Sequence, residues 1–134
     1  MTPRFAVIGI VVDDMGRALD FYRRLGLEVP DDSAGESHVE VALPGDLRLA
    51  FDTVETIHSF DPSWTAPTGG PRTALAFACA SPADVDRTVG ELETAGASVH
   101  LAPFDAFWGM RYATVTDPDG NHVDLFAVLD GAAP

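Results

Sequence analysis

The fold is decided by Asp13-Asp-Met-Gly-Arg-Ala-Leu-Asp-Phe-Tyr-Arg-Arg-Leu25-Gly26, a capped amphipathic segment that follows an apolar strand. A second copy reads Ser81-Pro-Ala-Asp-Val-Asp-Arg-Thr-Val-Gly-Glu-Leu-Glu-Thr-Ala95-Gly96, and it also follows an apolar strand. Aligning the two glycines superposes Tyr22 on Leu92. A repeat of this size predicts two half-domains that bury a face against each other, with any functional site between them.

Both segments carry helix start and stop signals. Asp13 or Asp14 can cap the first helix and Ser81 the second, because their side chains accept hydrogen bonds from free backbone N–H groups. Gly26 and Gly96 end the helices. The predicted apolar faces are Met15, Ala18, Leu19, Tyr22 and Leu25 in the first helix, and Val85, Val89, Leu92 and Ala95 in the second.

Apolar runs bounded by turn residues predict strands around the helices. They lie at residues 5–12, 36–43, 47–52, 73–79, 98–102, 110–116 and 122–128. The chain therefore reads as one α+β domain, 1–134, with a first module at about 4–54 and a second at about 72–129. The modules are joined by a predicted linker at about 55–71, where apolar residues show no periodic spacing, and a tail follows at 130–134.

Composition limits the possible partners. A net charge of −13 on 134 residues disfavours binding to nucleic acid or an anionic membrane and favours a cationic ligand, although many soluble proteins are acidic without such a role. No signal peptide or membrane-spanning run is recognised. The single cysteine, Cys79, is expected in the core, and its isolation favours a reducing cytoplasm.

Two motifs carry a family resemblance. Val12-Asp-Asp14 with Phe21-Tyr22 and Leu25-Gly26-Leu27 resembles the opening of a vicinal oxygen chelate module. The segment Thr116-Asp-Pro-Asp-Gly-Asn-His-Val-Asp-Leu-Phe126 resembles the closing hairpin of that superfamily, which includes glyoxalases, bleomycin resistance proteins and dioxygenases. The resemblance implies two tandem βαβββ modules that form a curved, half-open mixed β-sheet groove with helices on the outer face, usually in a homodimer.

The resemblance also implies where metal-dependent members hold their ion. In the first module these positions fall on Val7 and on Ala50, with Asp52 two residues after Ala50. In the second module they fall on Ala74, or on Arg72 if the register is shifted, and on Asp124. A divalent ion needs several convergent O or N ligands. Because only Asp124 keeps a plausible ligand at its position, we expect neither a metal nor another cofactor.

Strand alternation places small side chains on the predicted groove face. Ala74 and Ala76 share one side of their strand, while Leu75 and Phe77 face the helix. Val7 and Gly9 occupy the equivalent side of the first strand, and Ala50 belongs to the groove by its position in the family. The space this leaves can hold a ligand, or the aromatic side chains of Phe104, Phe107 and Trp108 can fill it.

The candidate ligand-binding residues are Trp108, Asp124, Phe126, Arg111, Ala74, Ala76, Val7, Gly9, Ala50 and Trp64. Asp124 would supply charge and Trp108 a stacking surface. Each has a structural alternative: Asp124 can pair with Arg111 or Arg48, Arg111 with a surface carboxylate, and the two tryptophans can lie in a dimer interface. His38, His58 and His100 are expected at the surface.

These observations favour a metal-independent protein that sequesters or carries an aromatic or cationic metabolite or antibiotic. The alternative is a glyoxalase-like lyase or isomerase, or a dioxygenase, without a metal or with an atypical one. In that case Asp124 and possibly His122 would be the catalytic residues. An ordinary metal-dependent enzyme ranks last, since its ligands are missing.

Overall fold

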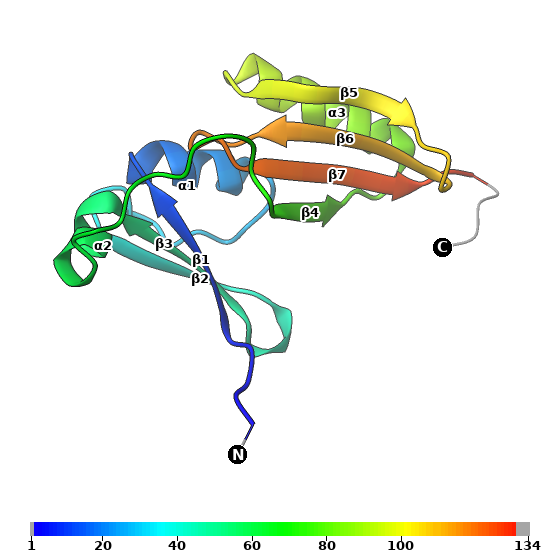
Figure 1. Ribbon diagram of the computed structural model, residues 1–134. Helices are drawn as coiled ribbons and strands as arrows, with labels where there is room; N and C mark the ends of the chain where they lie inside the picture. The colour runs from blue at the N-terminus through cyan, green and yellow to red at the C-terminus, as the bar shows by residue number, and fades with distance from the viewer. Residues whose placement is uncertain (1, 131–134) are drawn as a thin grey trace. The chain divides into compact units, whose positions relative to one another are not determined.

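In each half of the chain, one long helix lies on one face of a mixed β-sheet (Figure 1). The computed structural model describes residues 2–130, and the chain divides after Thr68 into two compact units. This boundary falls within the segment predicted as a linker. The predicted tail residues 131–134 lie outside the described part of the chain.

The first unit has a three-stranded sheet in the order β1-β3-β2, with β1 parallel and β2 antiparallel to β3. Its elements are β1 (Val7–Val12), α1 (Met15–Arg24), β2 (His38–Ala42), the 3₁₀ turn η1 (Pro44–Asp46), β3 (Arg48–Thr53) and α2 (Val54–Phe60). The strands predicted at 36–43 and 47–52 are therefore present as β2 and β3, and they pair as a hairpin.

Helix α1 follows its sequence signals closely. The Asp14 carboxylate accepts a hydrogen bond from the Arg17 backbone N–H at 3.0 Å, and Gly26 follows the helix with φ +91°. The buried side of the helix includes Tyr22, whose ring centroid lies 5.3 Å from that of Phe51 on β3. Apolar packing of α1 on the sheet thus forms the core of this unit.

The first unit differs from the expected βαβββ module in two respects. No strand forms between α1 and β2, where Pro30, Gly35 and the positive φ of Asp32 (58°) interrupt any alternating pattern. Instead, α2 occupies part of the segment predicted to be a linker. Thr53 caps it by accepting a hydrogen bond from the Thr56 N–H at 3.2 Å, but none of its residues is buried, so no apolar stripe marked it in the sequence.

The second unit has the predicted βαβββ order and a four-stranded sheet, β4-β7-β6-β5. Its elements are β4 (Ala74–Ala78), α3 (Pro82–Thr94), β5 (Ser98–Asp105), β6 (Met110–Thr116) and β7 (His122–Val128). Strand β4 runs parallel to β7, and the other pairs are antiparallel. The α+β class with two open mixed sheets is confirmed.

Helix α3 packs on β5, β6 and β7 of this sheet. Ser81 caps it by accepting from the Asp84 N–H at 3.2 Å, and Gly96 follows with φ +104°. Val85 and Leu92 are buried as predicted, whereas Ala95 is exposed, because it stands at the C-cap beyond the last turn that the sheet covers. Within residues 2–130, no helix is long and apolar enough to span a membrane.

Candidate functional site

The face of the second sheet opposite α3, here called the second open face, carries most of the predicted site. Strand alternation separates the two faces, because Val123, Leu125 and Ala127 of β7 are buried while the residues between them are partly accessible. The strand register places the following residues on the second open face: Ala74, Ala76, Ala78, Tyr112, Thr114, His122, Asp124 and Phe126.

Asp124 lies in the middle of this face and is fixed by two hydroxyl groups. Tyr112 Oη donates to Asp124 Oδ2 at 2.5 Å, and Thr114 Oγ1 donates to Oδ1 at 2.7 Å. Burial, together with the hydrogen bond to the neighbouring carboxylate, raises the pKa of Tyr112 to about 12. Tyr112 therefore remains a hydrogen-bond donor at neutral pH, and both carboxylate oxygens of Asp124 keep a defined orientation.

The charge of Asp124 has no cationic partner among the described ion pairs of the second unit. The arginines that form pairs there are Arg87, on α3, and Arg111. Arg111 points to the helix side of the sheet, where its Nε lies 3.0 Å from Asp86 Oδ1 and its Nη1 3.1 Å from Asp105 Oδ1. Arg111 thus does not share a face with Asp124. Of the two roles predicted for it, ligand binding and an ion pair with a surface carboxylate, the structure shows the ion pair.

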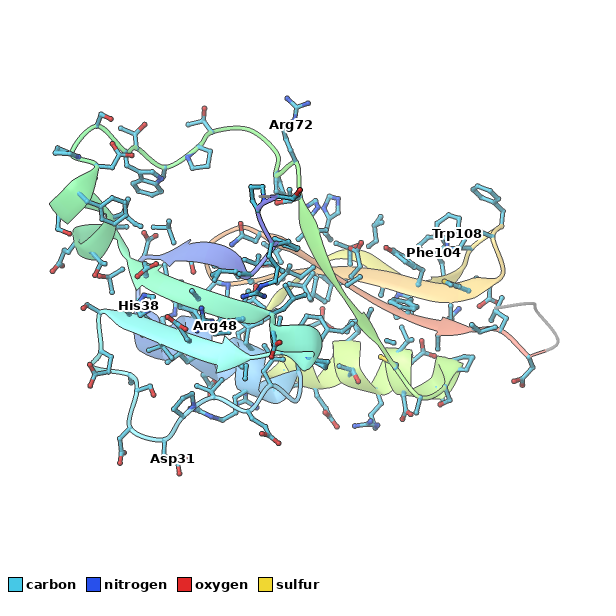
Figure 2. The ribbon with its side chains drawn as sticks, turned by 90° about the horizontal axis from the view of Figure 1, so that it is seen from below. Asp31, His38, Arg48, Arg72, Phe104 and Trp108 are labelled. Atoms are coloured by element: carbon cyan, nitrogen blue, oxygen red, sulfur yellow. The ribbon has the colours of Figure 1, made fainter. Side chains whose placement is uncertain are left out.

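Aromatic rings line one end of the second open face. The rings of Tyr112 and Phe126 stack with centroids 6.5 Å apart and an interplanar angle of 23°. Trp108 meets Tyr112 edge to face at 5.3 Å, and Phe104 meets Trp108 at 6.3 Å. Trp108 and Phe104, side by side in Figure 2, remain 46% and 37% exposed, so neither ring is absorbed into the core.

The opposite end of this face holds a pair of histidines. His122 shares the face with Asp124, and its ring stacks on that of His100 at a centroid distance of 4.5 Å. His100 is exposed, as the sequence predicts, but its contact with His122 was not predicted. His100 follows Val99, which pairs with the buried Val115, so alternation places His100 on the open face; a register shift of β5 also lies between Val99 and Leu101.

The first sheet also has an open face, opposite α1, and the predicted residues Val7, Gly9 and Ala50 lie on it. The register places Gly9 beside Ala50, and Ala50 beside Glu40. The first open face is defined by β1 residues Val7, Gly9 and Val11, β2 residues His38, Glu40 and Ala42, and β3 residues Arg48, Ala50 and Asp52. Ala50 itself is buried among these neighbours.

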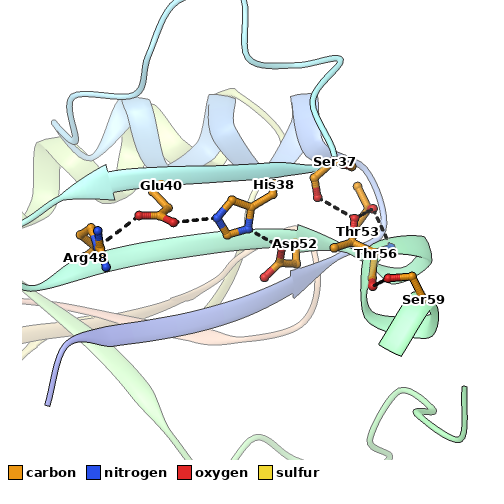
Figure 3. Close-up of polar contacts among 8 residues, drawn as sticks. All are labelled: Ser37, His38, Glu40, Arg48, Asp52, Thr53, Thr56 and Ser59. Carbon is orange, nitrogen blue, oxygen red and sulfur yellow. Dashed lines mark hydrogen bonds and ion pairs between the residues drawn. The ribbon is translucent and has the colours of Figure 1, made fainter. Parts of the chain in front are cut away.

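A chain of charged groups crosses the first open face (Figure 3). His38 lies between two carboxylates, with Nδ1 2.5 Å from Asp52 Oδ1 and Nε2 2.8 Å from Glu40 Oε2. Arg48 Nε lies 3.1 Å from the other oxygen, Oε1, of Glu40. The hydrogen bonds to Glu40 and Asp52 raise the pKa of His38, and the bond from His38 lowers the pKa of Glu40.

Sequence reasoning missed this cluster because it treated His38 as an isolated surface histidine. The signal was the alternation of His38 and Glu40 with Val39 and Val41, which places both polar side chains on the face opposite the core. The contribution of Asp52 required the register of β2 against β3.

Trp64, the remaining predicted residue, belongs to the first unit. His58 Nε2 donates to the Trp64 carbonyl oxygen at 2.8 Å, and the two rings contact each other with centroids 6.0 Å apart. The turn after α2 thereby orders the Trp64 side chain.

The side chains at the positions where metal-dependent members of the superfamily bind their ion do not form a metal site here. Val7, Ala50 and Ala74 offer no donor, and both oxygens of Asp124 accept hydrogen bonds from hydroxyl groups. Among residues 2–130, no group of three or more His, Cys, Asp or Glu side chains is placed to hold a metal. We therefore derive no reaction step through a metal.

Comparison with known proteins gives a consistent family. The sequence profile described as the Glyoxalase/Bleomycin resistance protein/Dioxygenase superfamily matches residues 4–125. Uncharacterized protein Mb0911c of Mycobacterium bovis is 30% identical over 122 residues, covering 87% of this chain and 78% of the relative. Uncharacterized protein Rv0887c of Mycobacterium tuberculosis is also 30% identical, with 69% of its length covered.

Solved structures share the fold. A glyoxalase/bleomycin resistance protein/dioxygenase family enzyme from Burkholderia phytofirmans has a TM-score of 0.78 at 21% identity, covering 92% of this chain and 98% of that one. A lactoylglutathione lyase from Agrobacterium tumefaciens has a TM-score of 0.64 at 20% identity, with 95% of each chain covered. At these identities the similarity concerns the architecture.

Proposed function

The chain belongs to the Glyoxalase/Bleomycin resistance protein/Dioxygenase superfamily, and from this premise we propose that it binds a small aromatic organic cation without using a metal. The second open face is the binding surface. In this proposal the protein sequesters or carries its ligand, which is a metabolite or an antibiotic, rather than transforming it.

The observation that carries the proposal is an oriented carboxylate that has no cationic partner among residues 2–130 and lies beside accessible aromatic rings. Asp124 is held by the neutral hydroxyls of Tyr112 and Thr114, so its negative charge remains available. The rings of Trp108 and Phe126 both lie near Tyr112. Such rings stabilise a cation over their faces by about 0.5–2 kcal/mol and stack on a planar ligand group.

Two properties support binding over acid–base catalysis at Asp124. Both oxygens of Asp124 already accept a hydrogen bond from a hydroxyl group, which suits a fixed electrostatic partner for a bound cation. Tyr112, with a pKa of about 12, retains its proton near neutral pH. The pKa of Tyr112 thus lies far from the operating pH, whereas that of an efficient proton donor or acceptor lies near it.

Fluorescence titration tests the proposal. In a Trp64→Phe background, Trp108 is the remaining tryptophan, and benzyltrimethylammonium should quench it saturably. Benzyl alcohol, which keeps the ring but lacks the charge, should bind at least about tenfold more weakly, corresponding to about 1.4 kcal/mol. Asp124→Asn should reduce the affinity for the cation by about the same factor and leave that for benzyl alcohol unchanged.

Glu93→Gln is the matched control, because it removes one negative charge from an exposed position on α3. This variant should bind benzyltrimethylammonium with wild-type affinity after correction for the small change in net charge. The proposal fails if Asp124→Asn and Glu93→Gln behave alike, or if the cation does not quench Trp108. Tightly bound transition metal in stoichiometric amount, found by elemental analysis of protein purified without chelators, would contradict metal independence.

A further inference from the structure

On the first open face, the Glu40 carboxylate lies between two basic side chains, Arg48 and His38. One oxygen of Glu40 faces Arg48 Nε at 3.1 Å and the other faces His38 Nε2 at 2.8 Å. The Glu40 carboxylate therefore bridges two donors of positive charge, as a bound ligand carboxylate does (Figure 3).

Asp52 favours the protonated form of His38, which donates a hydrogen bond to Glu40 as well. Both ring nitrogens of His38 lie within hydrogen-bond distance of carboxylate oxygens, and only the protonated imidazolium donates from both. The charged groups facing His38 are Glu40 on β2, and Asp52 and Arg48 on β3. Strand β1 presents Val7, Gly9 and Val11 to this face, and the hydroxyls of Thr56 and Ser59 lie beyond Asp52 on α2.

Two small residues follow Glu40 across the sheet. The next residue across the sheet is Ala50, and the one after it is Gly9, so this row carries nothing larger than a methyl group. A Cβ atom placed on Gly9 would meet no other atom within 4 Å. Ala50 is buried between its neighbours, so the accessible positions of this row are Gly9 and Glu40 itself.

A cavity of about 350 Å³ borders Arg48. Its lining residues are Arg4, Ala42, Leu43, Asp46, Leu47 and Arg48. Arg4 adds a second guanidinium to this lining and Asp46 adds a carboxylate, so the cavity beside Arg48 is lined by one more cationic than anionic side chain.

We propose that the first open face binds a small carboxylate-bearing ligand, whose carboxylate takes the place of Glu40 between Arg48 and His38. Glu40 is then an internal competitor that keeps the two cations paired while the ligand is absent. Its side chain is 38% exposed, so it can turn away into water without leaving a buried charge behind. The exchange replaces one carboxylate by another and therefore preserves the charge pairing at Arg48 and His38.

The proposed exchange of carboxylates predicts three effects on ligand binding that an ordinary surface ion pair does not. Removing Glu40 should strengthen binding of an external carboxylate, because the competitor is lost. Removing either cation should weaken it. Binding should also decline as the pH rises through the pKa of His38, because the neutral ring no longer donates to both sides.

NMR titration with sodium benzoate, which follows the His38 ring signals at about pH 6, tests the proposal. Wild-type protein should show weak saturable binding, and Glu40→Ala should bind roughly tenfold more tightly. Arg48→Gln should lose the binding, and His38→Gln, followed through backbone amides, should lose it as well. Glu55→Ala is the matched control, because it removes an exposed glutamate of the same unit outside the cluster.

Glu40→Gln serves as a second variant that keeps the side-chain length. The proposal is overturned if wild-type protein shows no saturable shift at His38, or if Glu40→Ala binds benzoate no better than Glu55→Ala. It is also overturned if benzoate binding persists in Arg48→Gln. The inference depends on the first unit alone, so Asp124→Asn should bind benzoate like wild-type protein, whatever the outcome for the cation site.

Discussion

Replacing Tyr112 by Phe separates the hydrogen bond to Asp124 from the aromatic packing around it. The ring of Phe keeps the contacts with Trp108 and Phe126, and only the hydroxyl that donates to Asp124 Oδ2 is lost. A hydrogen bond to a charged group contributes about 1.5–3 kcal/mol, and access of water to the partly exposed pair lowers this. We expect Tyr112→Phe to destabilise the protein by about 1 kcal/mol near pH 8.

The same substitution should alter the pH dependence of stability. The pKa of Tyr112 is about 12 in the folded protein against an ordinary value of 10. Because the folded pKa is the higher one, the folded state holds this proton more tightly, and the resulting stability is fully present below about pH 10. It is lost as the pH rises through the folded pKa.

The magnitude follows from this difference. A pKa raised from 10 to about 12 corresponds to at most about 2.7 kcal/mol. Solvent screening at the partly exposed ring reduces this to about 1–2 kcal/mol. The advantage of wild type over Tyr112→Phe, about 1 kcal/mol near pH 8, should fall by that amount between about pH 10 and pH 12 and so vanish or change sign, since Phe has no proton to lose.

Urea unfolding followed by far-ultraviolet circular dichroism measures this difference without interference from tyrosinate absorption. Asp124→Asn is a useful companion: it should reduce the pH-dependent loss but not abolish it, because burial of the Tyr112 hydroxyl remains. A difference between wild type and Tyr112→Phe that stays constant from about pH 8 to pH 12 would refute the reasoning.

Three further predictions concern the core, a helix cap and the first open face. Leu125→Ala should cost about 2–5 kcal/mol in urea unfolding, because Leu125 is 1% exposed in β7; a cost below about 1 kcal/mol would contradict its core position. Ser81→Ala should cost about 1 kcal/mol and Ser81→Asp much less, and equal losses would show that the cap is not formed. His38 should titrate above 6.5 by NMR, and because its folded pKa is the raised one, the stability it contributes should disappear as the pH rises through that value; a midpoint at or below 6.5 would count against the two carboxylate bonds.

Local sequence signals sufficed for the helices and for most strands. Asp14 and Ser81 cap α1 and α3, and Gly26 and Gly96 adopt the positive φ that ends them. These features depend on a few adjacent residues. The same is true of the alternation along β7, which placed Asp124 on the face opposite the core.

Features that depend on tertiary pairing could not be predicted in the same way. Helix α2 lacks a buried side, so its sequence has no apolar periodicity from which a helix could be predicted. The hydrogen bonds of Asp124 come from Tyr112 and Thr114 on the neighbouring strand, and they follow only once the register of β6 against β7 is known. Arg111 lies on the helix side because it alternates with Tyr112 along β6, and its ion-pair partner there, Asp86, stands 25 positions away in the chain.

Chemical-shift mapping of the wild-type protein with benzyltrimethylammonium tests most directly the central claim, that Asp124 and its aromatic neighbours form a cation site. Saturable shifts should centre on β6 and β7 around Tyr112 and Asp124, and on Trp108, and they should vanish in Asp124→Asn. Shifts centred elsewhere, or an unchanged pattern in Asp124→Asn, would contradict it.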